Sequence, residues 1–435
     1  MGTKASIAIL FLFVLTLGFL RSDVSAEFKP GGHAKVHLNF WNGFTGPDGQ
    51  VMLGIIRRFN DANPDVEVSM QRIDWNTYYN KLLVAALDGR GPQLFVIQSQ
   101  WMTRMHRNGF IADLSEMYRG KDAIPESDFV PYVIQQVKYG NEMAGVPLDI
   151  WPFGLYYNAD LFKQAGIVDA NGQPQPPRTR EEFLRDAKLM QHMGPGNVPD
   201  VWGYALTNWQ WNFQTVLPQF DGRYLDEKGR ADLANPSNVE ALQFLVSLKG
   251  PPTLIPPPEN ELGWTGFRQK QVAMVFDGIF MVGDLLRLND FNYRAAPMPV
   301  VGHHPGTLAD SHVLCIRKGL PDDQREAAER FIRFLSNNSI DWAAAGQVPA
   351  RTSARQNPAF AKMPVQYAFS KEIPYIQYPP RTPVEYELNT EVNFAVEKAI
   401  RGDATPLEAL KVANANVQKY IDADNERMRR EGISQ

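Results

Sequence analysis

Strand-like and helix-like apolar patterns alternate along the first quarter of this 435-residue chain. Apolar side chains recur at every second position in residues 36–40 and 66–70, and at helical spacing in residues 52–59 and 78–87. Residues 94–97 form a short apolar run of the kind found in buried strands. Side chains repeat every two residues in a strand and about every 3.6 residues in a helix. This order of elements predicts a layered α/β fold.

The alternation continues in the second third of the chain. Residues 154–157, 272–276 and 293–296 have strand patterns. Thr179 with Glu182 forms a capping box in front of a helix that we expect to reach about residue 193, and Pro236 marks the first turn of another helix. After a strand pattern at 313–316 the remaining segments are mainly helical, as at 326–335 and 407–421.

The first residues have the composition of a signal peptide. Lys4 precedes an apolar run over residues 5–20, which is shorter than the roughly 20 apolar residues that span a bilayer comfortably. Small residues follow, so we expect a signal peptide at residues 1–26, cleaved before Glu27; an uncleaved anchor is the alternative. A lipid anchor would need a cysteine at that point, and the only cysteine is Cys315. The sequence therefore predicts a periplasmic protein that is free in solution.

Composition limits the partners and cofactors. A net charge of -4 gives no basic surface for nucleic acid or anionic lipid. One cysteine excludes an intramolecular disulfide, and Cys315 is expected to be buried. The pair His303 and His304, with His312, has no spacing typical of a metal site, and no phosphate-binding glycine loop or nucleophile motif occurs. We therefore expect no catalytic residues, no metal and no cofactor.

Five segments carry a resemblance to one protein family. The strongest runs over residues 155–167 (LYYNADLFKQAGI) and is followed by PRTREEF at 177–183. FNDANP at 59–64, QVAMVFDG at 271–278 and the helical segment 327–337 complete the set. The chain resembles the family 1 extracellular solute-binding proteins, which include the maltose-binding and glycerol-phosphodiester-binding proteins.

The resemblance implies a periplasmic-binding-protein-like fold, with two α/β lobes, a hinge that the chain crosses more than once, and a cleft between the lobes. By analogy, lobe one takes residues 34–148 and 300–349, and lobe two takes 149–299 and 350–435. The implied function is the substrate-binding component of an ABC importer. Such a protein is a monomer that binds a carbohydrate by hinge closure and delivers it to the permease subunits in the membrane.

A carbohydrate site needs aromatic rings for the C–H faces of the sugar and planar polar groups for its hydroxyls. Ligands of open α/β sheets bind where strands end and helices begin. In lobe one, the residues at such ends and connections are Trp41, Asn42, Asp48, Gln98 and Ser99, and in lobe two they are Trp209, Trp211, Trp264, Asp277 and Gly278. The resemblance implies further contacts at Trp151 in the hinge, with Asp149 beside it, at Asp310, where the family has a glycine pair, and at Arg351, where the chain re-enters lobe two. Trp75 lies in a comparable connection.

Each candidate has a structural alternative. A tryptophan in a connection is as often a packing residue, since tryptophan is mostly buried. Trp209 and Trp211, if extended, would place both rings on one side as a platform. Asp149 is either a hydroxyl acceptor or a solvated hinge carboxylate, and Asp277 either contacts ligand or caps a helix. Because Asp277 and Gly278 close a strand before a helical segment, we expect Gly278 and Ile279 to offer free backbone N–H groups.

Two other functions remain open from the sequence alone. A secreted glycoside hydrolase would also be rich in tryptophan and would need two carboxylates facing one bond, for which Asp149 and Asp277 are the candidates. A helix-rich end of the chain argues against the barrel that many such enzymes use. The other function is a structural or sensory periplasmic module. Arg351 would suit an acidic or heavily hydroxylated ligand if it faces the cleft, and is otherwise an exposed arginine.

Overall fold

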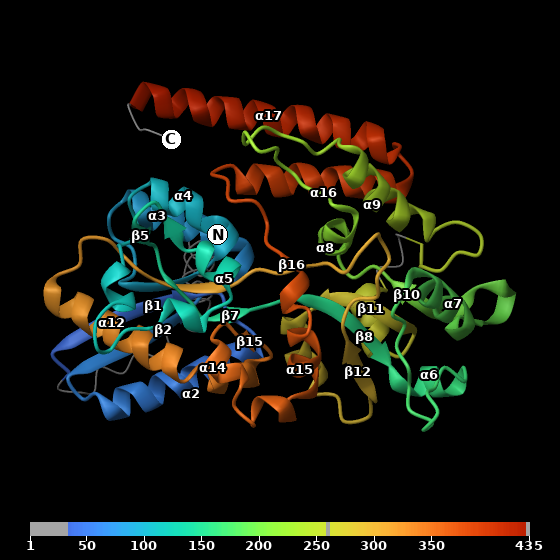
Figure 1. Ribbon diagram of the computed structural model, residues 1–435, viewed down its shortest axis with the longest axis horizontal. Helices are drawn as coiled ribbons and strands as arrows, with labels where there is room; N and C mark the ends of the chain where they lie inside the picture. Colours follow the sequence, from blue (N-terminus) through green and yellow to red (C-terminus); the bar gives the residue numbers. More distant parts are fainter. Residues whose placement is uncertain (1–33, 258–261, 432–435) are drawn as a thin grey trace, which may run out of the picture.

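The computed structural model describes residues 34–257 and 262–431, so the expected signal peptide lies outside the described residues. Two five-stranded sheets lie in two halves, side by side in Figure 1. The first sheet has the order β2-β1-β3-β14-β6 and the second β12-β8-β11-β10-β9. The first contains β1 (Val36–Asn42), β2 (Val66–Arg72), β3 (Leu94–Gln98), β6 (Val146–Pro147) and β14 (His312–Ile316). The second contains β8 (Phe153–Asn158), β9 (His192–Met193), β10 (Pro199–Ala205), β11 (Val272–Gly278) and β12 (Tyr293–Ala296).

Parallel pairing at the centre of each sheet places strand ends on one edge. In the first sheet β1 is parallel to β2 and β3, whereas β14 runs antiparallel to β3. In the second sheet β10 is parallel to β11, and β8 runs antiparallel to both β11 and β12. Every residue of β8 and β11 is buried. This explains why their sequences are apolar runs rather than alternating patterns.

Helices cover both sheets. Around the first sheet and its return segment these are α2 (Pro47–Ala62), α3 (Trp75–Leu87), α4 (Met102–Arg107), α5 (Pro131–Gln135), α12 (Asp322–Asn337), α13 (Ser339–Trp342) and α14 (Thr352–Arg355). Those that follow the strands of the second sheet are α6 (Ala159–Gln164), α7 (Arg180–Met190), α8 (Trp209–Val216), α9 (Pro236–Ser247), α10 (Gly263–Arg268), α11 (Val282–Leu285) and α15 (Pro364–Ser370). The expected helix start is confirmed, because Thr179 accepts the backbone N–H of Glu182 at 3.2 Å. The Glu182 carboxylate accepts the backbone N–H of Arg178 at 2.6 Å rather than that of Thr179, so the capping box is only half formed.

Three apolar clusters form the core. One surrounds the first sheet and contains Cys315, which is fully buried as expected. A second lies between the second sheet and the helices α8 and α9. A third joins the other side of the second sheet to α15 and to Trp151 at the junction of the halves. Each sheet therefore has a core of its own, which two lobes require.

The chain passes between the halves through short paired segments. The pair β7 (Asp149–Ile150) with β15 (Val348–Pro349) and the pair β13 (Thr307–Leu308) with β16 (Ile376–Gln377) lie between the two sheets. A third small pair, β4 (Lys138–Tyr139) with β5 (Glu142–Met143), belongs to the first half. The strands of each sheet fall within the lobes expected from the sequence. The exact lobe boundaries stay a prediction.

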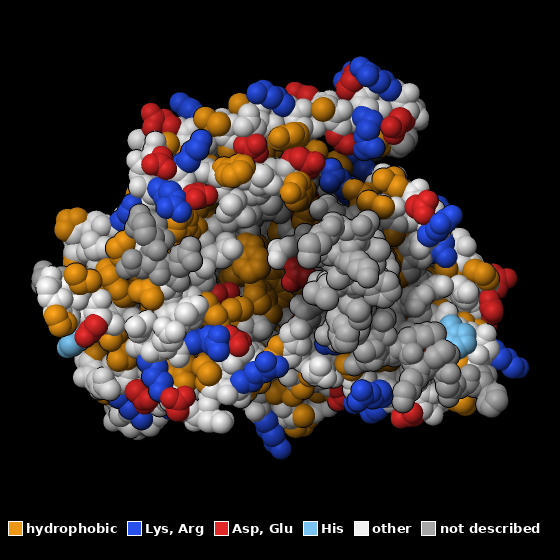
Figure 2. Space-filling view, turned by 180° about the vertical axis from the view of Figure 1, so that it is seen from behind, with side chains coloured by type: hydrophobic (Ala, Val, Ile, Leu, Met, Phe, Trp, Pro, Cys, Tyr) orange, Lys and Arg blue, Asp and Glu red, His pale blue; other side chains and the backbone are white. Residues whose placement is uncertain are grey.

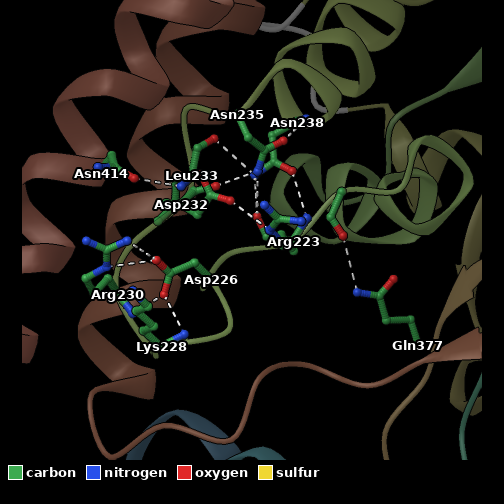
Figure 3. A network of polar contacts seen from close by, with 11 residues as sticks. Arg223, Asp226, Lys228, Arg230, Asp232, Leu233, Asn235, Asn238, Gln377 and Asn414 are labelled. Carbon is green, nitrogen blue, oxygen red and sulfur yellow. Dashed lines mark hydrogen bonds and ion pairs between the residues drawn. The ribbon is translucent and has the colours of Figure 1, made fainter.

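The two last helices, α16 (Glu385–Arg401) and α17 (Pro406–Glu431), lie across the top of both halves in Figure 1. A polar loop before α9 fixes α17 to the second half: the backbone N–H of Leu233 donates to Asn414 on α17 at 2.7 Å, as Figure 3 shows. On the other side, Arg107 of α4 forms an ion pair with Asp424 of α17 at 3.1 Å. The C-terminal helices thus contact both halves. The sequence patterns indicated α17 but not α16.

A buried acid just after α15 gives a testable pH dependence. Glu372 accepts the backbone N–H of Met298, and burial raises its pKa to about 8. The unfolded chain loses this proton near pH 4.5, so the free energy of unfolding should fall as pH rises from about 5 to about 8. In Glu372→Gln the amide oxygen can still accept the backbone N–H of Met298, and the side chain cannot ionise. Its stability relative to wild type should therefore increase by about 2–3 kcal/mol between pH 5 and pH 8 in urea denaturation.

The matched control is Glu227→Gln, because Glu227 is exposed. Its stability relative to wild type should be nearly the same at both pH values. A Glu372→Gln difference that does not change with pH would show that Glu372 is already ionised in the folded protein.

Candidate functional site

Aromatic rings follow one another along the carboxyl edge of the first sheet. Trp101 stacks on Tyr79 with ring centroids 4.5 Å apart, and Tyr79 stacks on Trp75 at 5.7 Å. Trp75 in turn lies nearly parallel to the imidazole of His312, at 5.6 Å and 19°. All three rings of Trp101, Tyr79 and Trp75 are partly exposed. They come from the starts of helices that follow β2 and β3, where open sheets place ligands.

The series of rings continues into the second half. Trp151 lies 6.2 Å from His312 and 6.0 Å from Phe280, and Phe280 lies 5.5 Å from Trp211. Trp211 is 37% exposed, so part of its side chain is open to solvent. We call these residues the aromatic series: Trp101, Tyr79, Trp75, His312, Trp151, Phe280 and Trp211. Figure 2 shows the face opposite to that of Figure 1, hollowed between the halves, with hydrophobic side chains inside the hollow.

A buried ion pair lies beneath the middle of the aromatic series. Asp149 is 0% exposed and accepts from His312 Nδ1 at 2.8 Å, from the His312 backbone N–H at 2.9 Å and from Trp342 Nε1 at 2.7 Å. Burial lowers the pKa of His312, but the Asp149 carboxylate, with Asp48 and Asp310 nearby, outweighs it and raises that pKa above its usual value. Asp149 therefore holds the imidazole in place and has no oxygen open to a ligand. This contradicts both sequence-based expectations for Asp149, a hydroxyl acceptor and a solvated carboxylate.

A second buried carboxylate, that of Asp310, lies just before β14 and beside the end of β3. Asp310 is 0% exposed, accepts the hydroxyl of Ser99 and lies 3.4 Å from the Gln100 backbone N–H. Burial raises the pKa of Asp310 to about 6, so it is mainly ionised at pH 7. Gln98 accepts from the Gln100 side chain at 3.3 Å. The structure thus brings Gln98, Ser99 and Asp310 together, and their role in binding stays a prediction.

Amide side chains connect this strand end to the second half. Asn389 of α16 donates to Gln100 at 3.3 Å and accepts from Gln210 and Gln214 of α8 at 2.9 and 3.0 Å. Asn389 also donates to Glu385 at 2.7 Å. Arg104 forms an ion pair with Glu387 at 2.9 Å on the same side. The halves are therefore held together through α16 by exchangeable polar contacts rather than by a continuous apolar core.

Two buried donors near the aromatic series have no protein partner. Asn42 is 0% exposed; its Oδ1 accepts the Phe44 backbone N–H at 3.2 Å, but Nδ2 has no acceptor among the described residues. The same holds for Nε1 of Trp151, which is 4% exposed. Asp48 is half-buried, and burial raises its pKa. Buried polar atoms normally have partners. Hydroxyl oxygens of a ligand would supply them here.

The expected platform of Trp209 and Trp211 is wrong. Asn208 accepts the Trp211 backbone N–H at 2.9 Å and so caps helix α8, which begins at Trp209. Side chains two positions apart in a helix point away from each other. Trp211 therefore joins the aromatic series, whereas Trp209 lies under the guanidinium of Arg401, 5.1 Å from its ring centroid. An asparagine before the tryptophans was the signal for a helix start that the strand interpretation overlooked.

Other expected site residues have structural partners instead. Arg351 forms an ion pair with Asp128 at 2.6 Å, so its charge is compensated within the protein. Trp264 packs against Tyr156 and Phe267 and takes part in no contact with the aromatic series.

The strand end at β11 also differs from expectation. The Gly278 N–H donates to Asp277 at 2.7 Å and the Ile279 N–H donates to Pro152 at 3.0 Å, so neither N–H is free. Burial raises the pKa of Asp277 to about 7. Trp41 is partly exposed at the end of β1 and has no ring partner among the described residues.

Trp75, Trp151 and Trp211 lie in connections that were singled out from the sequence, whereas Tyr79, Phe280 and His312 were missed as members of the aromatic series. Tyr79 lies one helical turn after Trp75 in α3, a spacing that could have identified it. Phe280 follows Asp277 by three residues and has only its position after a strand as a signal. His312 begins β14, and nothing in the sequence indicates that it meets Asp149.

The buried ion pair generates a stability prediction. Asp149→Asn removes the charge that compensates His312 and should lower the free energy of unfolding by about 3 kcal/mol at pH 6, measured by urea denaturation. The control Asp122→Asn changes an exposed carboxylate and should cost less than about 0.5 kcal/mol. If both variants have the stability of the wild type, His312 is neutral and the ion pair does not form.

Comparison with known proteins supplies the family. The family model that describes the bacterial extracellular solute-binding proteins matches residues 45–341 of this chain. The arabinooligosaccharide-binding protein of Bacillus subtilis is 22% identical over 80% of this chain and 81% of its own length. The sn-glycerol-3-phosphate-binding periplasmic protein UgpB of Salmonella typhimurium is 23% identical, over 94% of this chain and 96% of its own.

Solved structures show the same fold. The ABC substrate-binding protein Lmo0181 from Listeria monocytogenes, in complex with cycloalternan, has a TM-score of 0.76 at 24% identity and covers 89% of this chain and 99% of its own. The sugar-binding protein MalE from Xanthomonas citri has a TM-score of 0.77 at 19% identity, covering 90% and 99%. No helix among residues 34–257 and 262–431 has the length and apolar character needed to cross a bilayer. The expected two-lobed fold is confirmed, and this chain belongs to the bacterial extracellular solute-binding protein family.

Proposed function

We propose that this protein is the extracytoplasmic component of an ABC importer that captures a carbohydrate in the hollow between its lobes. The observation that carries the proposal is the aromatic series, which passes from the first sheet to the second through Trp75, His312 and Trp151. Rings of this kind cover the C–H faces of sugars. Relatives named for arabino-oligosaccharide and maltotriose binding support the ligand class.

The polar groups beside the rings suit the hydroxyls of a sugar. Asn42 and Trp151 each present a buried donor with no acceptor in the part of the chain that the structure describes, and Asp48 presents a half-buried carboxyl group. A carboxylate can accept from two neighbouring hydroxyls, while the two donors serve hydroxyl oxygens. With Gln98 at the end of β3, these residues form the polar part of the proposed site.

Binding works by closure of the lobes. The sugar docks on the rings of lobe one, lobe two approaches with Trp211, and water leaves the hollow, which strengthens each hydrogen bond. The amide contacts of Asn389 and the ion pair of Arg104 with Glu387 form or break as the lobes move. Closure also sets the relative position of the outer lobe surfaces that the permease contacts. The protein acts as a monomer in the periplasm, after removal of its signal peptide.

The hydrolase alternative needs two carboxylates facing one bond. Asp149 is fully buried, and its oxygens are bound by His312 and Trp342. Asp277 is 4% exposed and accepts the N–H of its neighbour Gly278. Neither group is placed to donate or accept a proton at a glycosidic bond. We therefore propose that the protein binds and releases its ligand without chemical change.

A ligand screen followed by one variant tests the proposal. Maltotriose, mannotriose and arabinotriose are screened by thermal shift, since a ligand present at 100 times its Kd stabilises the folded state by about 2.7 kcal/mol. With the oligosaccharide that binds, Trp211→Ala should weaken binding by about 2–4 kcal/mol in calorimetry, because it removes a partly exposed ring from the site.

The control is Tyr420→Ala, which removes a 42% exposed ring on α17 outside the aromatic series. It should leave the affinity unchanged. Equal affinities for the wild type and Trp211→Ala would remove Trp211 from the site. Failure of all oligosaccharides to bind would count against the proposed function itself.

A further inference from the structure

Side-chain amides form a hydrogen-bonded row that begins on α8 of the second half and ends on β3 of the first. Gln210 and Gln214 of α8 donate to Asn389 of α16 at 2.9 and 3.0 Å. Asn389 donates to Gln100 at 3.3 Å, and Gln100 donates to the side-chain oxygen of Gln98 at 3.3 Å. We call these five residues the amide row. In each of its hydrogen bonds the donor lies on the side of α8 and the acceptor on the side of β3.

Asn389, in the middle of the amide row, uses its whole hydrogen-bonding capacity. A carboxamide has two N–H donors and an oxygen that accepts twice. The Asn389 oxygen accepts from Gln210 and Gln214. Its nitrogen donates to Glu385 at 2.7 Å as well as to Gln100. Turning this amide over would bring its oxygen to the accepting oxygen of Glu385 and its N–H groups to those of the two glutamines of α8.

Glu385 sets the direction of the amide row. It is 2% exposed, its Oε1 accepts from Asn389, and its Oε2 has no partner among the described residues. Burial, with Asp310 and Glu387 nearby, raises the pKa of Glu385 well above its usual value. A protonated carboxyl group still accepts through its carbonyl oxygen, so Glu385 can accept from Asn389 in both protonation states. Glu387 is itself paired with Arg104 at 2.9 Å.

The amide row ends beside the aromatic series. The backbone N–H of Gln98 donates to the Tyr79 hydroxyl at 3.2 Å. Gln98 also lies directly opposite His312 in the antiparallel pair of β3 and β14, so the two side chains are on the same face of the sheet. Because the Gln98 oxygen is directed to Gln100, the group left for a ligand is its Nε2, which has no acceptor among residues 34–257 and 262–431.

We propose that Glu385 and Asn389 are positioning residues of the cleft: through the amide row they fix Gln98 as a hydrogen-bond donor to the bound carbohydrate. The inference rests on the proposed function and adds the direction of one contact to it. A sugar hydroxyl whose only proton is already donated elsewhere can accept from Gln98 but cannot donate to it. The direction of the amide row therefore decides which hydroxyl arrangement the cleft accepts.

Exchanging the carboxyl group and the amide between positions 385 and 389 tests the proposal. Asn389→Asp alone places two carboxyl groups face to face and should lower the urea midpoint of unfolding. Adding Glu385→Gln restores a donor between the two positions, so the midpoint should return close to that of the wild type. The carboxylate at position 389 only accepts, so Gln100 and Gln98 both turn their amides over, and Gln98 then presents its oxygen to the cleft. In calorimetry this double variant should bind the oligosaccharide selected by thermal shift at least ten times more weakly than the wild type.

The matched control makes the same exchange at Glu391 of α16 and Asn416 of α17. Asn416 donates to Glu391 at 2.9 Å, and neither side chain forms a hydrogen bond or ion pair with the described residues of the first half. Glu391→Gln combined with Asn416→Asp should therefore keep the wild-type affinity. Wild-type affinity in the double variant at positions 385 and 389 would overturn the inference and leave solute binding intact.

Gln98→Glu gives a readout that a purely structural role would not change. The introduced carboxylate still accepts from Gln100 but has no proton for the ligand, so the affinity should fall at least tenfold at pH 7. A protonated carboxyl group can donate, so the affinity relative to wild type should rise at least twofold between pH 7 and pH 5. Asp310 and His312 titrate in both proteins, and the ratio of the two affinities removes their effect.

The outcomes of the Gln98→Glu measurement separate the two proposals. Wild-type affinity at pH 7, or a loss that does not change with pH, would show that Gln98 does not donate to the ligand and would overturn the inference alone. If no oligosaccharide binds to the wild type, the proposed function fails and this inference fails with it.

Discussion

The contact between Asp149 and His312 at the junction of the lobes is the interaction on which the rest of the site depends. His312 begins β14 of the first sheet, and Asp149 lies where the chain leaves that sheet for the second. Their hydrogen bond at 2.8 Å, with Trp342 as a further donor, holds the imidazole between Trp75 and Trp151. Separating the pair would leave an uncompensated buried charge, which is costly. The pair therefore keeps the imidazole in a fixed position between a ring of lobe one and a ring of lobe two.

The proposed site contains two kinds of group that recognise a ligand, aromatic rings and polar side chains. Rings of the aromatic series offer flat apolar surface, and the half-buried carboxyl group of Asp48 offers a hydrogen-bond acceptor. Polar contacts such as that of Asn389 with Gln100 join α16 to the turn that follows β3.

Much of the fold could be predicted from the sequence, because its elements obey local rules. The strands at 293–296 and 313–316 and the helix that follows Asn235 appear where their patterns indicated. The residues of the candidate site were harder to predict from the sequence. The position of Ser99 at the end of β3 could be predicted because a strand end is a local signal, whereas the partners of Asp149 and Arg351 come from distant parts of the chain. The prediction for Trp209 was wrong because Asn208 caps a helix that begins at Trp209. In a helix, unlike a strand, residues 209 and 211 lie on different sides.

The most direct test of the central claim is a crystal structure of the protein with the neutral oligosaccharide that stabilises it. The account predicts a sugar ring against Trp75 or Trp151, hydroxyls within hydrogen-bond distance of Asp48 and of the Asn42 and Trp151 nitrogens, and Trp211 of lobe two in contact with the ligand. A sugar bound elsewhere, for example in the surface groove lined by Ile167, Gln175 and Leu189 of lobe two, with the aromatic series untouched, would contradict it.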